Sequence, residues 1–353
     1  MRWAPSLISG VAAAIVLLLA GCGGGGSGGF PAAPEQTAPP PTTTPTPDPV
    51  PVPEPVPAAS FQLGGAVDHP ARLDVAALSA RPAVPQSVAY SSGSGAQTRS
   101  YVGADLWSLL VDAGLQADRA RKNDLLSRYV LATGADGYKV VFALGELNPD
   151  FGLKGSTVAY ADTGAGTAAP LSAADGPFRV TAPGDVKGGR YVSNLVRLDV
   201  AASAATAVGS GGGTSSGFAV SGAVAGAPVR FDLAALQALA PTTQVVGTDT
   251  YVGVSLWTLL NNTLGLSVPP GSKNASLAMY AVATGSDGYR ATVSLGEIDP
   301  GFGNKPALVA YELNGAPLGA RGVARLVVPG DLKASRSVSN LVAIEVFAAP
   351  SAP

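Results

Sequence analysis

Residues 132–138 read ATGADGY, and residues 283–289 read ATGSDGY. In the first copy the Asp-Gly pair separates two runs rich in β-branched and aromatic residues, 129–133 and 138–142. Glycine readily adopts the positive φ that a tight hairpin turn requires, and aspartate is expected there for turn geometry alone. Each stretch therefore predicts a β-hairpin, and its return predicts that one fold unit occurs twice.

Further blocks return in the same order at a spacing of about 150 residues, which marks an internal duplication. They are YVGADLWSLL (101–110) and YVGVSLWTLL (251–260), LGELNPDFG (144–152) and LGEIDPGFG (295–303), and PGDVKGGRYVSNLV (183–196) and PGDLKASRSVSNLV (329–342). A unit of this length is a whole domain and not one turn of a solenoid. We expect domains at residues 59–204 and 218–349, each able to fold alone, with a Gly/Ser linker at 205–217.

Each unit predicts an α+β fold dominated by strands. Residues 106–113 place leucines and alanine at i, i+3, i+4 and i+7, so one face of a helix is apolar. Trp107 and Trp257 lie between leucines of these helices and are expected to anchor the core. The remaining apolar runs are short, β-rich and bounded by glycine, which favours a β-rich fold with few short helices.

The N-terminal residues predict export and lipid attachment. One basic residue precedes an uncharged apolar run that is typical of a secretory signal peptide, which we place at residues 1–21. The sequence Leu-Ala-Gly-Cys ending at Cys22 resembles the lipobox of bacterial lipoproteins, so Cys22 is the predicted lipidation site. Cys22 is the sole cysteine, and a disulfide within the chain is excluded. We expect an extracytoplasmic protein, lipid-anchored to the periplasmic side or the cell surface.

Residues 22–58 predict a disordered stalk. They begin with glycines and continue into a proline-rich stretch with almost no apolar side chains to bury. The formal net charge of −2 gives no basic field for nucleic acid. The membrane, reached through the lipid on Cys22, is therefore the one partner that the sequence predicts directly.

The hairpin, the YxGxxLWxLL helix and the PGDxKxxRxVSNLV ending together resemble the molybdopterin-binding domain of sulfite-oxidase-like oxidoreductases. The resemblance spans nearly all of both repeats. It implies a β-rich fold of that family and, in catalytic members, a molybdenum atom held by a pyranopterin dithiolene and one cysteine thiolate.

The metal-binding part of that chemistry is missing from the repeats. Thiolate is a soft ligand suited to molybdenum, yet neither repeat has a cysteine. His69 has no counterpart in the second copy, and Met279 is the one methionine in either repeat. We expect no metal ligand and no catalytic residue, and molybdopterin enters only through the resemblance.

The closing block supplies the candidate cofactor-binding residues. Two cations near small-residue backbone suit a phosphate or carboxylate, although a solvated basic turn is the alternative. In that alternative the two asparagines bond local backbone. The candidates are Lys187, Arg190, Ser193 and Asn194 in the first repeat and Lys333, Arg336, Ser339 and Asn340 in the second.

Two functions remain after these observations. The first is a binding or interaction module at the cell envelope that recognises a small anionic or pterin-like ligand or another envelope protein. The second is a molybdopterin-dependent oxidoreductase of the sulfite-oxidase-like class with atypical ligation. The missing thiolate favours the first, because function depends on the site and not on the fold.

Overall fold

The computed structural model describes residues 59–271 and 273–350. The predicted signal peptide at residues 1–21, the lipidation site Cys22 and the stalk at residues 22–58 lie outside the described residues. In the part that is described, no helix is both long and apolar enough to cross a membrane.

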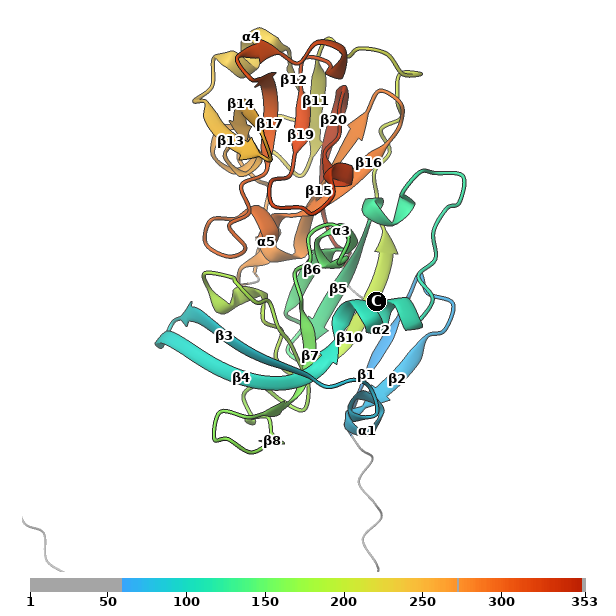
Figure 1. The fold of residues 1–353 in the computed structure, drawn as a ribbon, viewed down its shortest axis with the longest axis vertical. Coiled ribbons are helices and arrows are strands. Elements are labelled where there is room, and N and C mark those ends of the chain that lie inside the picture. The colour runs from blue at the N-terminus through green and yellow to red at the C-terminus, as the bar shows by residue number, and fades with distance from the viewer. Residues whose placement is uncertain (1–58, 272, 351–353) are drawn as a thin grey trace, which may run out of the picture. The chain divides into compact units, whose positions relative to one another are not determined.

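The first repeat folds into two sheets (Figure 1). One has the strand order β2-β1-β10-β5-β6, in which only β1 and β10 run parallel. The other has the antiparallel order β3-β4-β7-β8, with β9 also paired to β7. The strands are β1 (Ser60–Gly65), β2 (Ala71–Asp74), β3 (Val84–Ser92), β4 (Gly95–Asp105), β5 (Arg128–Gly134), β6 (Lys139–Ala143), β7 (Thr157–Asp162), β8 (Ala169–Pro170), β9 (Arg179–Val180) and β10 (Leu195–Ala202).

The second repeat has the same two sheets, strand for strand. Its orders are β12-β11-β20-β15-β16 and β13-β14-β17-β18, with β19 paired to β17 and only β11 and β20 parallel. The prediction of two tandem copies of a β-rich α+β fold is therefore confirmed. The strands are β11 (Phe218–Gly222), β12 (Val229–Phe231), β13 (Thr242–Val246), β14 (Asp249–Ser255), β15 (Met279–Gly285), β16 (Arg290–Ser294), β17 (Leu308–Leu313), β18 (Ala316–Pro317), β19 (Arg325–Val327) and β20 (Leu341–Ala348).

The helices are few and short, as expected. The predicted apolar face is buried in α2, and Asp105 caps this helix by accepting a hydrogen bond from the Ser108 amide at 2.7 Å. Trp107 is half-buried against the core. The α-helices are α1 (Val75–Ser79), α2 (Leu106–Asp112), α3 (Leu144–Leu147), α4 (Leu233–Gln237) and α5 (Leu295–Ile298). The 3-10 helices are η1 (Asp124–Ser127), η2 (Gly188–Arg190), η4 (Ala275–Ala278), η5 (Gly319–Arg321) and η6 (Ala334–Arg336), and η3 (Thr258–Leu264) is a π-helix.

The predicted hairpin is present in both repeats. Strands β5 and β6 pair across the Asp-Gly turn, and Gly137 has a φ of 80°. The Asp136 carboxylate accepts a hydrogen bond from the Tyr138 amide at 3.0 Å, and Asp287 does the same for Tyr289. Turn geometry therefore explains these aspartates without a catalytic role.

The two repeats share apolar packing. Each has its own core, but Leu277 of the second repeat is buried in the core of the first. A third cluster joins strands of both repeats, and the rings of the equivalent residues Tyr129 and Tyr280 lie 4.5 Å apart in it. The described residues of both repeats, 59–271 and 273–350, group in one compact unit.

The Gly/Ser linker lies against the second repeat. Glu345 accepts hydrogen bonds from the amides of Thr206 and Ala207, and the Gly212 amide donates to the Ser286 carbonyl at 2.8 Å. The backbone groups of the linker thus have specific partners, which glycine-rich composition alone does not predict.

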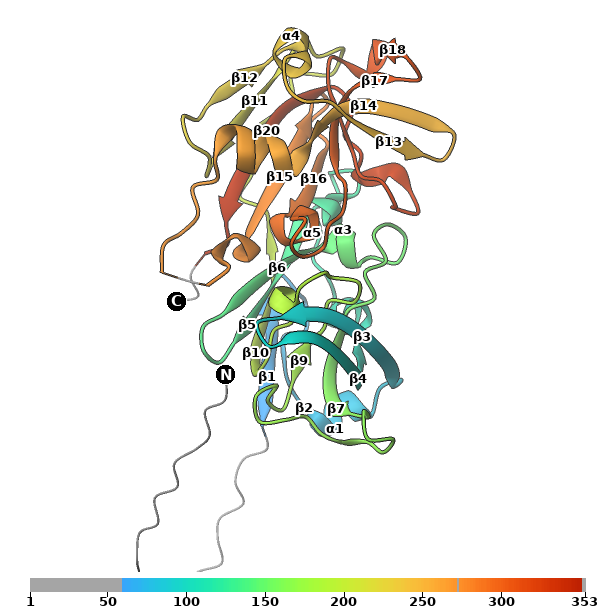
Figure 2. The ribbon, with the colours of Figure 1, turned by 90° about the vertical axis from the view of Figure 1, so that its left-hand side faces the viewer.

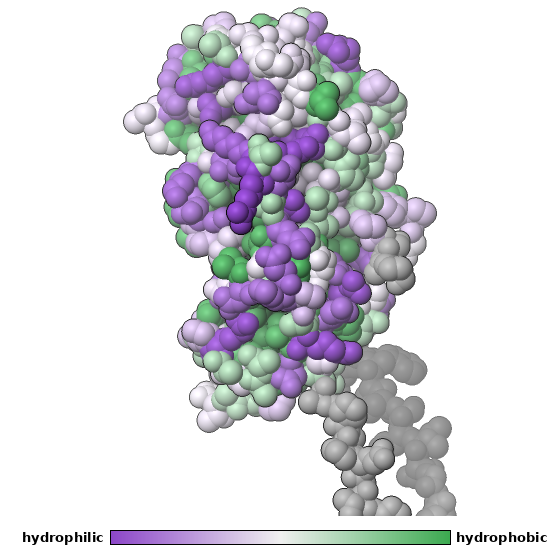
Figure 3. All heavy atoms as spheres, turned by 90° about the vertical axis from the view of Figure 1, so that its right-hand side faces the viewer, coloured by the Kyte–Doolittle hydropathy of each residue, from purple (hydrophilic) through white to green (hydrophobic). Residues whose placement is uncertain are grey.

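Large exposed apolar side chains are scattered over the described surface and include Val111, Leu153, Val208 and Leu332. Figure 3 shows one face on which hydrophilic and hydrophobic side chains are intermixed. Isolated exposed apolar residues are normal for a folded protein, so they do not by themselves indicate a docking surface.

Candidate functional site

Arg336 of η6 is fully buried and donates four hydrogen bonds to two carboxylates of its own repeat, one of them from Nε to Asp331 at 2.7 Å. Its NH1 and NH2 groups donate to the two carboxylate oxygens of Glu297 at 2.9 and 2.8 Å, and NH2 also donates to Asp331 at 2.7 Å. Lys305 contacts the same aspartate at 2.6 Å. Such bidentate pairs are strong and directional, so this guanidinium group is fixed in place.

Arg190 of η2 is the counterpart of Arg336 and is equally buried. Its NH2 group donates to Glu146 at 2.5 Å, while NH1 lies 3.6 Å from Asp185. The guanidinium carbon lies 4.6 Å from the centre of the Phe142 ring. Nε and NH1 have no hydrogen-bond acceptor, so Arg190 is less completely satisfied than Arg336.

These two charged clusters meet where the repeats pack together. A Cβ atom on Gly145 would lie 2.5 Å from Cδ of Arg336, and one on Gly296 would lie 2.9 Å from Cδ of Arg190. Glycine in each Leu-Gly-Glu segment thus permits the arginine of the other repeat to approach. The Ser294 hydroxyl also donates to Glu146 at 3.1 Å across this interface.

The two glutamates at this interface have opposite pKa shifts. Burial raises the pKa of Glu146 despite Arg190, and the nearby charge of Glu297 raises it further. Burial opposes ionisation of Glu297 as well, but the two hydrogen bonds and the charge of Arg336 outweigh it and lower the pKa of Glu297.

This arrangement gives two of the predicted ligand residues another role. Arg190 and Arg336 bond carboxylates of their own repeat and stabilise the repeat interface, so they do not form cation pairs with Lys187 and Lys333 for an anion. Lys333 is exposed and contacts Asp150 of the first repeat at 2.7 Å.

The predicted residues Asn194 and Asn340 form hydrogen bonds with the backbone. Asn194 and Asn340 have φ values of 48° and 52°, a conformation that asparagine tolerates better than most residues. Their side-chain amides donate to the carbonyls of Ala174 and Ala320 at 3.2 and 3.1 Å. Backbone bonding therefore accounts for both, although each partner lies 20 residues away and not in the local turn.

Lys187 and Ser193, in contrast, line a cavity of about 780 Å³. The cavity lies beside the tip of the hairpin β3–β4, whose strands are seen in Figure 2. Residues Lys273, Asn274 and Phe302 of the second repeat complete its wall. Its volume is within the range of small-molecule sites.

The cavity combines aromatic walls with positive charge. The rings of Tyr90 and Tyr191 lie 4.4 Å apart, and burial raises the pKa of Tyr191, which keeps its hydroxyl neutral. Arg179 donates to the Tyr90 hydroxyl at 3.2 Å and pairs with Asp175. Lys187 and Lys273 add two exposed cations at the rim.

The second repeat has a smaller equivalent of this cavity, of about 360 Å³. Ser339 and Asn340 line it, and so do Gly212 and Gly213 of the linker. The Ser286 hydroxyl donates to the Gly213 carbonyl at 2.7 Å. The linker thus fills part of the cavity in the second repeat, while the cavity in the first repeat remains open.

Sequence reasoning missed Tyr90, Arg179 and Lys273. The hairpin β3–β4 is longer than β13–β14, so Tyr90 has no equivalent in the second repeat, and Tyr191 is replaced there by Ser337. The sequence blocks that match between the repeats indicate the fold that the repeats have in common. The residues that differ between the repeats would have indicated this cavity.

Comparison with known proteins agrees with the resemblance in the second repeat. Residues 223–352 match the family model described as oxidoreductase molybdopterin binding domain. No curated protein matches the chain. Among solved structures, the sulfane dehydrogenase SoxCD from Paracoccus pantotrophus has 12% identity and a TM-score of 0.33, with 80% of this chain and 77% of that chain covered.

The described residues do not fit the metal that this family implies. Met279 holds the only sulfur atom among residues 59–350, and it is fully buried in the apolar core. No group of three or more histidine, cysteine, aspartate or glutamate side chains in the described part is arranged to hold a metal ion. The soft thiolate that suits molybdenum has no equivalent at the cavity.

Proposed function

We propose that this protein is a lipid-anchored binding module of the bacterial cell envelope. In this proposal the first repeat holds a small anionic ligand with a planar ring, such as a pterin. The observation that carries it is the cavity of about 780 Å³, which brings Tyr90 and Tyr191 together with Arg179, Lys187 and Lys273.

The chemistry of the cavity matches this ligand class. Aromatic side chains pack against a planar ring, and cationic side chains bind carboxylate or phosphate by charge-assisted hydrogen bonds. The family match of residues 223–352 supports a scaffold related to molybdopterin binding. The donor atoms at the cavity suit the organic part of such a ligand and not its metal.

Cys22 and the proline-rich stalk support the location at the envelope. A lipid on Cys22 would hold the chain at the membrane surface, with residues 22–58 as a spacer that places the ligand cavity away from it. The net charge of −2 does not favour nucleic acid as a partner. A Cys22→Ser chain, which we expect to leave the membrane fraction, provides the soluble form for binding measurements.

The test is a fluorescence titration of that soluble chain with pterin-6-carboxylate. Lys187→Ala should weaken binding about tenfold, because the anion loses a charge-assisted hydrogen bond. Lys333→Ala is the matched control, since its ammonium group contacts Asp150 outside the cavity. Failure of the wild-type chain to bind, or equal loss in both variants, would contradict the proposal.

The family match keeps an oxidoreductase as the second candidate. It requires molybdenum with a ligand other than cysteine, such as a serine or aspartate oxygen, which is a harder donor. Molybdenum bound to the exported chain would favour this candidate over the binding module.

A further inference from the structure

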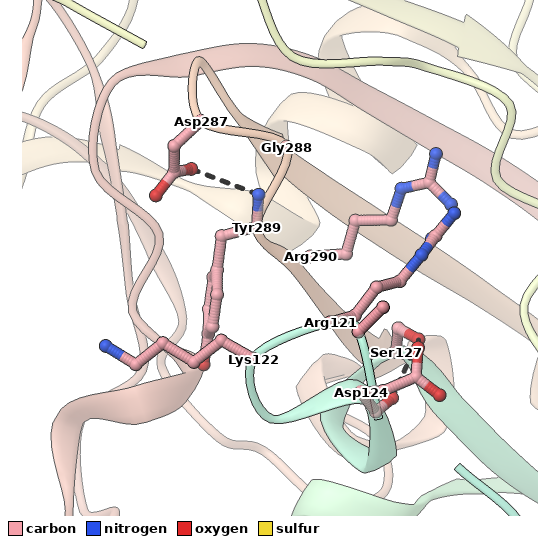
Figure 4. Close-up of a pocket in the computed structure, with 9 residues that line it drawn as sticks. Arg121, Lys122, Asp124, Ser127, Asp287, Gly288, Tyr289 and Arg290 are labelled. Carbon is pink, nitrogen blue, oxygen red and sulfur yellow. Dashed lines mark hydrogen bonds between the residues drawn. The ribbon is translucent and has the colours of Figure 1, made fainter. Parts of the chain in front are cut away.

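A third cavity, of about 200 Å³, lies between the repeats; it shares Lys122, Asp287 and Tyr289 with the cavity of about 360 Å³ and no residue with the ligand cavity. The loop that contains Arg121 and Lys122 forms one side of it, and the turn at residues 287–289 with Arg290, the first residue of β16, forms the other (Figure 4). The proposed pterin site has none of these residues in its wall. Any ligand held here is therefore separate from the proposed function.

Arg290 enters this cavity with part of its guanidinium group unsatisfied. NH2 donates to the Ala207 carbonyl at 2.6 Å, and Glu345 fixes that linker residue by accepting from its amide at 3.0 Å. The Nε atom of Arg290 is buried and has no acceptor. A buried donor without an acceptor is costly, so the site is incomplete as it stands.

Arg121 brings a second guanidinium group beside Arg290. Figure 4 shows the two groups next to each other, although they come from different repeats. Burial lowers the pKa of Arg290 and the charge of Arg121 lowers it further, whereas the charges of Glu345 and Asp124 partly oppose this shift. Two adjacent like charges are unfavourable unless a negative charge lies close to both.

The nearby carboxylates are already engaged. Asp124 accepts from Arg128 at 2.8 Å and from the Asp118 amide at 2.9 Å. Asp287 accepts from the Tyr289 amide in its own turn. Asp118 lies 3.2 Å from Nε of Arg121, at a position where both side chains are about half exposed.

We infer that Arg121 and Arg290 together bind one small oxyanion, of the phosphate, sulfate or carboxylate class. The forked guanidinium groups match two oxygen atoms of such an anion, whose negative charge would lie close to both arginines. The volume admits a single small group and excludes a ligand the size of a pterin with its side chain. Because the arginines belong to different repeats, the anion would link the repeats.

Inorganic phosphate is the probe for this site, titrated calorimetrically into the full chain carrying Cys22→Ser. We expect one phosphate per chain and affinity at least tenfold weaker in Arg121→Gln and in Arg290→Gln, while exposed Arg72→Gln on β2 binds like the parent. Arg121 is exposed, so its variant should fold normally even if loss of the Ala207 contact perturbs Arg290→Gln.

The second measurement is binding to vesicles that contain phosphatidylglycerol, because a lipid headgroup offers the same phosphate chemistry. Binding of free phosphate that is lost in Arg121→Gln supports the proposal. No phosphate binding, equal affinity in all variants, or binding to vesicles alone would overturn it. Arg121→Gln should keep the pterin-6-carboxylate affinity of its parent, so this result and the test of the proposed function stand apart.

Discussion

Glu146 and Glu297 occupy equivalent positions, but their surroundings favour different protonation states. Glu297 accepts two hydrogen bonds from Arg336, whereas Glu146 accepts one from Arg190 and one from Ser294. Both side chains are almost completely buried. A buried carboxylate is stable as an anion only where charge and hydrogen bonds compensate for lost hydration, and this compensation is more complete at Glu297.

Glu297→Gln should therefore destabilise the protein more than Glu146→Gln. Removing one partner of a buried ion pair leaves the other uncompensated, which costs about 3–5 kcal/mol. Glu146→Gln should cost less, because the raised pKa of Glu146 already disfavours its charge. Urea unfolding at neutral pH measures both, and an equal or reversed order would contradict this interpretation of the cluster.

The ion pair of Glu297 with Arg336 predicts that the stability of the protein depends on pH. Because the folded state lowers the pKa of Glu297, its contribution is present above the unfolded value of about 4.3 and is lost as pH falls through the folded pKa. The stability difference between wild type and Glu297→Gln should shrink over that acid range. A difference that does not change with pH would show that the ionised carboxylate is not what stabilises the interface.

At the scale of elements, the hairpin β3–β4 distinguishes the two copies. Its strands continue beyond the point that matches the end of β13–β14, and Ser91 donates its amide to the Val186 carbonyl at 2.9 Å beside the cavity. The second repeat folds with the short version, so the extension is not needed for the fold.

Replacing residues 87–100 with the sequence of residues 245–250 should keep the fold and remove the ligand site. The change deletes Tyr90 and the cavity wall at the hairpin tip, so pterin-6-carboxylate affinity should fall at least tenfold. Fluorescence titration measures the affinity, and circular dichroism checks the fold. Retained affinity in a folded variant would place the ligand elsewhere.

Elements were predictable from the sequence where local patterns determine them. The helix at residues 106–113 and the Asp-Gly hairpins follow from periodicity and turn chemistry, and both are confirmed. The partners of Arg190 were not predictable, because Glu146 lies 44 residues away and the charge of Glu297 comes from the other repeat. Lys187 and Ser193, which the sequence predicted as binding residues, do line the cavity of about 780 Å³. The sequence did not indicate the residues from other elements that complete its wall.

At the scale of the whole molecule, the described residues of the two repeats pack as one unit. Separation would expose the Tyr129 and Tyr280 cluster and would give water access to the charged groups buried between the repeats. The boundaries at residues 59–204 and 218–349 stay a prediction, and from the shared packing we propose that each repeat depends on the other for its stability.

Fragments 59–204 and 218–349, expressed separately, should each unfold with low cooperativity and be sensitive to protease. Mixing them should restore a cooperative thermal transition, because the interface supplies apolar burial and ion pairing that neither fragment has alone. Two fragments with sharp transitions near that of the full chain would contradict this.

The central claim is that the chain binds a ligand without molybdenum, since the repeats have no thiolate. Its most direct test is the molybdenum content per chain, measured by mass spectrometry on protein exported by its own signal from a host that makes molybdopterin. We predict far less than one molybdenum atom per chain, with or without bound pterin. Near-stoichiometric molybdenum that is lost in Lys187→Ala would contradict the account and identify the protein as an oxidoreductase.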